Sequence, residues 1–204
     1  MSDKQVRVGI LGGTFSPIHH GHVICAQEAR IQLELDAVRL MPAGTPPHRE
    51  LEPDEDPGDK HRLSMVRLAV IGQPGLEVST TELEREGTSY TVDTLAELVD
   101  QEPDAQFTLI IGADQAMSFG NWREPERIAQ LADIAVAARV DNDREEAIAE
   151  VIRATGGKEP LHFAMPRVDI SSTFIRERIY RGETVAHLVP AGIPELIEEA
   201  QLYR

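Results

Sequence analysis

Segments with the pattern of a β-strand alternate with segments with the pattern of an α-helix along most of this chain, which limits the folds open to it. Short runs rich in Val, Ile and Leu predict strands at residues 6–11, 37–43, 76–83, 106–112, 133–139 and 161–165. Helical spacing of apolar residues predicts helices at residues 21–35, 60–71, 91–100, 125–132, 144–157, 170–182 and 193–203. The alternation predicts an α/β fold with a doubly wound, mainly parallel sheet, helices on both faces and a C-terminal helical segment.

The connecting segments carry further expectations. Residues 44–60 are rich in Pro and acidic residues and lack periodicity, so they predict a long loop. Asp59 is expected to be the N-cap of the helix at 60–71, and residues 113–115 are expected to form a loop. Ligands of such sheets bind outside the carboxyl ends of the strands, so the loops that follow the strands are where a functional site is expected.

Composition excludes several classes of protein. The chain has 204 residues, which suits one domain, and its net charge of −15 argues against a nucleic-acid backbone as partner. The single cysteine, Cys25, excludes a disulfide framework and fits a reducing compartment. We find no apolar run long enough for a membrane span and no signal-peptide core, and expect a cytoplasmic protein without a membrane partner. The sequence leaves the oligomeric state open, a homodimer included.

The segment LGGTFSPIHHGH, residues 11–22, lies at the carboxyl end of the first predicted strand. It matches neither the glycine pattern of dinucleotide-binding folds nor the P-loop. Three interpretations are open: a zinc site, a structural turn, or a phosphate site built from glycines, helix N–H groups, His19 and His22. The other histidines and Cys25 offer no matching second pair of zinc ligands, which favours phosphate.

A second cluster, ISSTFIR at residues 170–176, favours the same anion. It places Ser171, Ser172 and Thr173 at a helix start, with Arg176 about one turn further on. By itself this pattern also fits an ordinary N-cap followed by a solvated arginine. Together with the histidine segment, it predicts the far wall of a phosphate site, because hydroxyls, a helix N-terminus and a guanidinium all attract anions.

The order of these motifs resembles the nucleotidylyltransferase superfamily and, within it, the bacterial nicotinate-nucleotide adenylyltransferases. The resemblance runs from GGTFSPIHHGH through PAGTPPHR, GTSYTVDTL and IIGAD to ISSTFIR and the terminal LVP and LYR. It implies a Rossmann-like fold and the transfer of AMP from ATP to nicotinate mononucleotide, with release of pyrophosphate. It also implies Mg²⁺ bound through the ATP phosphates, with no metal site of the protein's own.

The resemblance assigns site residues to this chain. The catalytic residues would be His19, His22 and Arg176. The ATP-binding residues would be these three with Gly12, Gly13, Thr14, Phe15, Gly112, Asp114, Ser171, Ser172 and Thr173. The mononucleotide-binding residues would be Gly44, Thr45, His48, Tyr90, Thr91, Trp122 and Arg139.

Two departures from the family pattern and two alternatives accompany this assignment. Ser16 stands where the family usually has Asp or Asn before Pro, and we expect the turn to keep its geometry. The segment after Arg139 lacks the usual Pro-Gly, which leaves the role of Arg139 open. Asp114 also fits a turn-forming residue, and Trp122 also fits a packing aromatic.

The expected domain organisation is a single nucleotidylyltransferase domain over residues 1–204, with residues 167–204 closing the ATP site. The amide mononucleotide and another phosphorylated acceptor, such as phosphopantetheine, are alternative substrates. A nucleotide-binding sensor without catalysis is the alternative from another class, against which the intact His19, His22 and Arg176 argue.

Overall fold

The computed structural model describes residues 5–45, 55–138 and 144–204. Six parallel strands form one sheet, and every strand lies within a predicted segment or extends it by one or two residues. The strands are β1 (Val6–Gly13), β2 (Ala37–Pro42), β3 (Leu76–Val78), β4 (Ala105–Gly112), β5 (Asp133–Ala138) and β6 (Leu161–Ala164).

The strand order is β3-β2-β1-β4-β5-β6, so β1 and β4 are neighbours at the centre of the sheet. The chain moves outward from β1 through β2 to β3 and then returns to the other side of β1 as β4. The order therefore reverses between β1 and β4, where an open parallel sheet has a crevice outside the carboxyl ends of its strands. The predicted Rossmann-like fold is confirmed, and its crevice lies beside the histidine segment.

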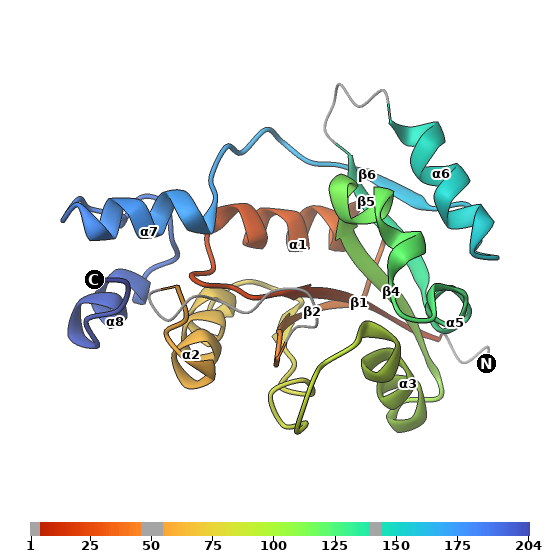
Figure 1. The fold of residues 1–204 in the computed structure, drawn as a ribbon, viewed down its shortest axis with the longest axis horizontal. Helices are drawn as coiled ribbons and strands as arrows, with labels where there is room; N and C mark the ends of the chain where they lie inside the picture. Colours follow the sequence, from red (N-terminus) through yellow and green to blue (C-terminus); the bar gives the residue numbers. More distant parts are fainter. Residues whose placement is uncertain (1–4, 46–54, 139–143) are drawn as a thin grey trace.

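Helices cover both faces of the sheet (Figure 1). One core contains side chains of α1 (His20–Gln32), α2 (Asp59–Val70), α7 (Ser172–Tyr180) and α8 (Ile193–Glu199). The opposite core contains side chains of α3 (Thr91–Gln101), α4 (Ala113–Met117), α5 (Pro125–Leu131) and α6 (Glu145–Ala154), with a short 3₁₀ turn at Phe119–Asn121. Along β1 and β4, neighbouring residues alternate between the two cores, as the two-residue period of a strand requires.

Four local expectations were wrong. The strand predicted at 76–83 ends at Val78, because the amides of Leu83 and Glu84 turn back to the carbonyl of Thr80. The N-cap of α2 is Gly58, at φ 81°, and Asp59 is the first helical residue.

The third wrong expectation concerns residues 113–115. They form helix α4, which buries Ala116 and begins where Gln115 accepts a hydrogen bond from the Gly112 amide. A helix of five residues is too short for its apolar spacing to be recognised in a sequence.

The C-terminal helix also ends earlier than predicted. It was expected to reach residue 203 but stops at Glu199, and the last residues form a turn. Gln201 and Tyr203 both have positive φ, at 52° and 61°, although neither is glycine. This backbone path buries both Leu202 and Tyr203 in the core beside α8.

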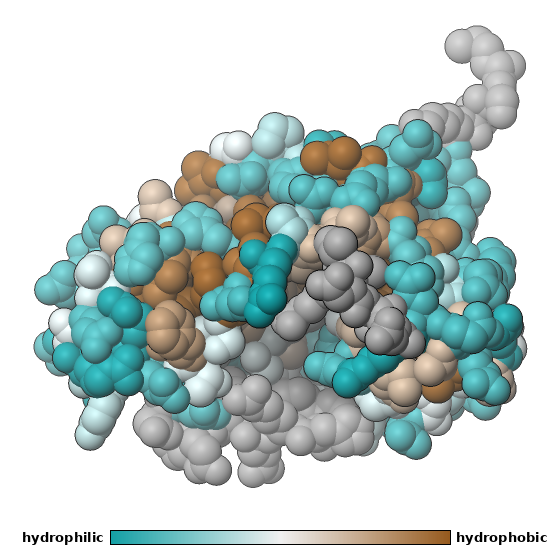
Figure 2. Space-filling model, turned by 90° about the horizontal axis from the view of Figure 1, so that it is seen from above, coloured by the Kyte–Doolittle hydropathy of each residue, from teal (hydrophilic) through white to brown (hydrophobic). Residues whose placement is uncertain are grey.

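On the molecular face seen in Figure 2, polar side chains predominate, and apolar side chains gather in smaller groups among them. This agrees with the acidic composition of the chain. Within the part of the chain that the structure describes, no helix is long and apolar enough to cross a membrane.

Candidate active site

The loop after β1 packs its aromatic ring inward rather than presenting it to solvent. Phe15 has a positive φ of 50° and is almost completely buried, and its ring meets the imidazole of His22 edge-on at 5.0 Å between centroids. A Cβ at Gly13 would lie 2.9 Å from the Phe15 ring, so glycine there allows the close approach. The loop backbone, rather than the Phe15 side chain, is left to meet a ligand.

His19 and His22 lie together at the beginning of α1. Their rings are stacked, 3.8 Å between centroids and 27° from parallel. His19 is the N-cap, and its backbone amide donates to Nδ1 of His22 over 3.3 Å. The amide of His20 instead donates to the carbonyl of Leu188, which ties the helix start to the C-terminal segment. The structure thus pairs the two predicted histidines and gives His20 a separate contact.

Burial keeps this histidine pair neutral. It lowers the pKa of His19 from 6.5 to about 4, with a smaller effect from His20. Burial also lowers the pKa of His22 well below its ordinary value, with a smaller effect from His19. Among the described residues, no group hydrogen-bonds to Nδ1 of His19, although that atom is buried. At neutral pH each imidazole therefore offers an N–H donor rather than a positive charge.

The ISSTFIR cluster approaches the same loop from α7. Ser171 is the N-cap, and its Oγ accepts from the amide of Phe174 over 3.1 Å. The Oγ of Ser172 donates to the carbonyl of Pro17 over 2.9 Å. These hydroxyls are therefore engaged in holding the helix and the loop together.

Arg176, on α7, contacts this loop directly. Its Nη1 donates to the carbonyl of Ser16 over 2.8 Å, and its Nη2 is 3.4 Å from Oγ1 of Thr173. Nη2 also pairs with the carboxylate of Glu55. Arg176 is only 9% exposed, so the structure contradicts the alternative of a solvated arginine.

Ser16 keeps the turn in place by a contact that the sequence did not predict. Its Oγ hydrogen-bonds to the carbonyl of Glu55 and lies 3.1 Å from the hydroxyl of Tyr203. Ser16 and Tyr203 are both buried, and Tyr203 is the penultimate residue of the chain.

Asp114 lies at the carboxyl end of β4, in the first turn of α4, on the other side of the crevice. Its side chain is 95% exposed and pairs with Arg144 at 3.0 Å. The preceding Gly112 is the N-cap of α4. An exposed carboxylate at this edge is accessible to a ligand hydroxyl.

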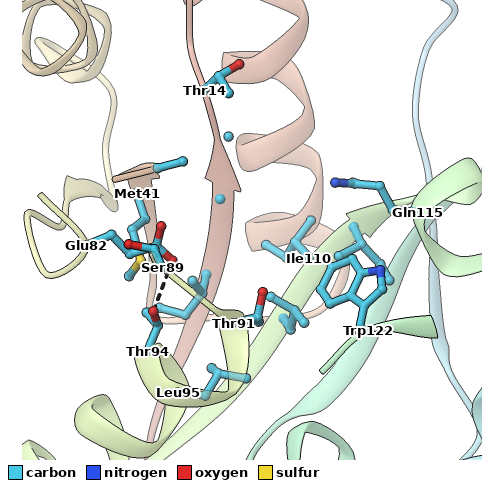
Figure 3. Close-up of a pocket in the computed structure, with 16 residues that line it drawn as sticks. Thr14, Met41, Glu82, Ser89, Thr91, Thr94, Leu95, Ile110, Gln115 and Trp122 are labelled. Atoms are coloured by element: carbon cyan, nitrogen blue, oxygen red, sulfur yellow. Dashed lines mark hydrogen bonds between the residues drawn. The ribbon is translucent and has the colours of Figure 1, made fainter. Parts of the chain in front are cut away.

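A cavity of about 230 Å³ opens beside the loop after β1 (Figure 3). Two of the predicted mononucleotide residues, Thr91 and Trp122, contribute to its wall, as do Gly12, Gly13 and Thr14 of the predicted ATP loop. In Figure 3 Trp122 and Gln115 lie on one side of this cavity, with Glu82, Ser89 and Thr94 on the other.

The remaining mononucleotide residues lie around the cavity wall or outside the described chain. The ring of Tyr90 is covered by the guanidinium of Arg123, 4.4 Å from the ring centroid. Gly44 and Thr45 follow β2, where Thr45 pairs with Thr88. His48 and Arg139 lie outside the described residues.

Sequence reasoning missed four polar residues that line the cavity, namely Glu82, Ser89, Thr94 and Gln115. Ser89 stands directly before the predicted Tyr90 and Thr91, which was a usable signal. Glu82 gave none, because it fell inside a predicted strand whose real end is Val78. Within the described part of the chain, no group of three His, Cys, Asp or Glu side chains could hold a metal ion.

Known proteins resemble this chain over nearly its full length. The cytidylyltransferase-like family matches residues 10–178. A probable nicotinate-nucleotide adenylyltransferase of Synechococcus sp. (strain JA-3-3Ab) is 39% identical over 98% of this chain and 96% of its own length. One of Rhodopirellula baltica is 39% identical, over 97% and 93% of the two chains.

A solved structure has the same fold. The Plasmodium falciparum nicotinic acid mononucleotide adenylyltransferase complexed with NaAD matches with a TM-score of 0.79 at 16% identity, covering 97% of each chain. Matching fold and full-length similarity agree with the residue pattern around the crevice. The chain therefore belongs to the cytidylyltransferase-like family and, within it, to the nicotinate-nucleotide adenylyltransferases.

Proposed function

We propose that this protein transfers AMP from ATP to nicotinate mononucleotide, giving nicotinate adenine dinucleotide and pyrophosphate. The observation that carries the proposal is the meeting of His19, His22 and Arg176 around the β1 loop, at the reversal of strand order. The adjoining cavity contains Trp122, whose flat ring suits a pyridine ring. The names of the relatives support this substrate class.

The proposed reaction needs alignment and charge stabilisation more than proton transfer. The attacking group is the phosphate of the mononucleotide, which is ionised at neutral pH. It displaces pyrophosphate from the α-phosphorus of ATP, and negative charge grows on the leaving oxygens. His19 and His22 would donate N–H groups to phosphate oxygens. Arg176 would supply positive charge after exchanging its contact with Glu55 for a phosphate oxygen.

The other proposed ATP contacts come from the loop and the two helix starts. Gly12, Gly13, Thr14 and Phe15 would contribute mainly backbone groups, and Gly112 with the exposed Asp114 would face the ribose. Ser171, Ser172 and Thr173 would complete the phosphate end.

The donors beside the β1 loop are imidazoles, hydroxyls and a guanidinium, which suit phosphate oxygens rather than Mg²⁺. A Mg²⁺ ion would therefore be held by the ATP oxygens themselves, where it neutralises part of their charge. Our proposal assigns the ion to ATP and no ligand role to a protein side chain.

The mononucleotide is proposed to occupy the cavity between Trp122 and Thr91, with Tyr90, Gly44 and Thr45 around it. His48 and Arg139 belong to the same proposal on sequence grounds. The cytoplasm is the proposed location, in keeping with the single cysteine, Cys25.

We further propose that residues 167–204 close the ATP site as part of a single domain over residues 1–204. Three contacts from this segment support closure, and all reach residues 16–20. They are the bonds from Ser172 to Pro17 and from Arg176 to Ser16, and the bond from the His20 amide to Leu188.

The decisive experiment supplies the purified protein with ATP, Mg²⁺ and either nicotinate mononucleotide or its amide, and measures pyrophosphate release. We expect dinucleotide from the acid at a kcat/KM at least about tenfold above that for the amide. Comparable values with both would contradict the acid preference. A folded protein that releases no pyrophosphate with either would contradict a pyridine mononucleotide as the acceptor, and phosphopantetheine would then be the next acceptor to supply. No pyrophosphate with that acceptor either would contradict the transferase itself.

A further inference from the structure

Glu82 is the one ionisable side chain among the described residues that line the cavity. It lies after β3, in the turn that replaces the end of the predicted strand. Its carboxylate points toward Ser89 and Thr94 at the cavity wall (Figure 3). No role for Glu82 follows from the phosphate chemistry at the other end of the crevice.

The two carboxylate oxygens of Glu82 connect different elements. Oε1 accepts a hydrogen bond from the hydroxyl of Thr94 on α3 over 3.0 Å. Oε2 accepts from the backbone amide of Gly44, in the loop after β2, over 3.3 Å. One side chain therefore joins the loop proposed to hold the mononucleotide to the helix that begins at Thr91.

The loop that contains Gly44 and the segment from Glu82 to Ser89 are packed too closely for one to move without the other. A Cβ at Gly44 would lie 2.5 Å from the carbonyl oxygen of Glu82 and 2.6 Å from Oγ of Ser89. The next residue, Thr45, accepts a hydrogen bond from the amide of Ser89 over 2.8 Å. The positions of the two loops are thus set together, and a shift of one moves the other.

Opposing effects act on the pKa of the Glu82 carboxyl. Burial raises the pKa of its carboxyl, while the hydrogen bonds from Thr94 and Gly44 and the nearby Arg85 and Arg62 act in the opposite direction. Moving a carboxylate out of water costs free energy of folding, and the hydrogen bonds that it accepts offset that cost. Replacing Glu82 removes both the cost and the hydrogen bonds, so a large change in stability is not required. Stability and substrate binding can therefore be separated by mutation.

We propose that Glu82 is a positioning residue for the mononucleotide: by joining Gly44 to Thr94 it sets the distance between the two walls of that half of the cavity. The proposal rests on the proposed function and adds a residue to it. Because Glu82 acts on the mononucleotide walls and has no contact with the His19, His22 and Arg176 cluster, ATP binding is expected to be largely independent of it.

The test compares steady-state kinetics of Glu82→Ala, Glu82→Gln and the wild type, with each substrate varied in turn. We expect Glu82→Ala to raise the KM for nicotinate mononucleotide about tenfold, with the KM for ATP and kcat within about twofold. Glu82→Gln retains an acceptor oxygen and is expected to bring this KM back to within about threefold of wild type. Glu86→Ala is the matched control, since Glu86 is an exposed carboxylate on the same loop.

Circular dichroism and thermal melting establish that each variant is folded. If Glu82→Ala does not fold, Thr94→Val removes one of the two connections and is expected to raise the same KM at least threefold. A folded variant whose KM for the mononucleotide equals that of Glu86→Ala would overturn the Glu82 proposal alone. Equal increases in both KM values would overturn it too. Failure of the wild type to form dinucleotide would instead overturn the proposed function.

Discussion

The buried pair of histidines makes the stability of this protein depend on pH in a defined window. The folded chain holds His19 with a pKa of about 4, whereas the unfolded chain has the ordinary value of 6.5. As pH falls, the unfolded chain takes up a proton first. Stability is therefore present above about pH 6.5 and is lost as pH falls through the interval down to about 4.

The magnitude follows from the difference between the two pKa values. A difference of one pKa unit is worth about 1.4 kcal/mol. The two pKa values of His19 therefore correspond to a loss of about 3 kcal/mol in the free energy of unfolding over the whole interval. Between pH 7 and pH 5 the loss attributable to His19 is about 2 kcal/mol. His19 is only 7% exposed, so solvent screening reduces this value little. Since His19 also lowers the pKa of His22, its removal reduces the contribution of both rings.

Urea denaturation at pH 7 and pH 5 measures the effect in the wild type and in His19→Gln. We expect the wild type to lose about 2 kcal/mol more than the variant on acidification, because the carboxylates titrate in both and their effect cancels in the difference. His187→Gln, which removes an exposed histidine, is the control and should follow the wild type closely. An equal loss in wild type and His19→Gln would refute the argument that burial keeps His19 neutral.

Two further substitutions test the cavity and the C-terminal contact. Trp122→Ala is expected to raise the KM for nicotinate mononucleotide about tenfold by removing its aromatic surface, while the KM for ATP stays within about twofold. An unchanged KM in steady-state kinetics would indicate that Trp122 packs against Phe119 and does not bind the mononucleotide. Tyr203→Phe removes the hydroxyl beside Ser16 and should lower the free energy of unfolding by about 1 kcal/mol in urea. Tyr180→Phe, at an 80% exposed position, is its control, and equal stability of the two variants would count against a role for the Ser16 contact.

Much of the fold was predictable because its information is local. The runs at β1 and β4 are apolar over several consecutive residues, and alternation of strands with helices permits few topologies other than a parallel sheet covered on both sides. Helix ends were also predictable from the local sequence: Gly182 follows α7 at φ 70°, where glycine is favoured. Elements of three to five residues, such as β3 and α4, have too few positions for a period to show.

The histidine segment and the ISSTFIR cluster were both predictable from the sequence as anion-binding candidates, because glycines, hydroxyls and a helix start have that property wherever they lie. Their meeting was a matter of tertiary structure. Ser16 and Arg176 are 160 positions apart in the chain, and only the sheet order and the packing of α7 bring the guanidinium to the loop carbonyl.

Burial and long-range partners were decided only by the tertiary structure. His19 is neutral because the fold removes it from water, and Glu82 connects Gly44 to Thr94 because the loops after β2 and β3 meet helix α3 at the cavity. Neither property can be predicted from the type of a residue or from its spacing in the sequence. The sequence by itself determined most of the strands and helices and the candidate phosphate-binding residues, since these depend on neighbouring residues. The charge state of the histidines and the walls of the cavity depend on contacts between distant residues, which only the folded chain provides.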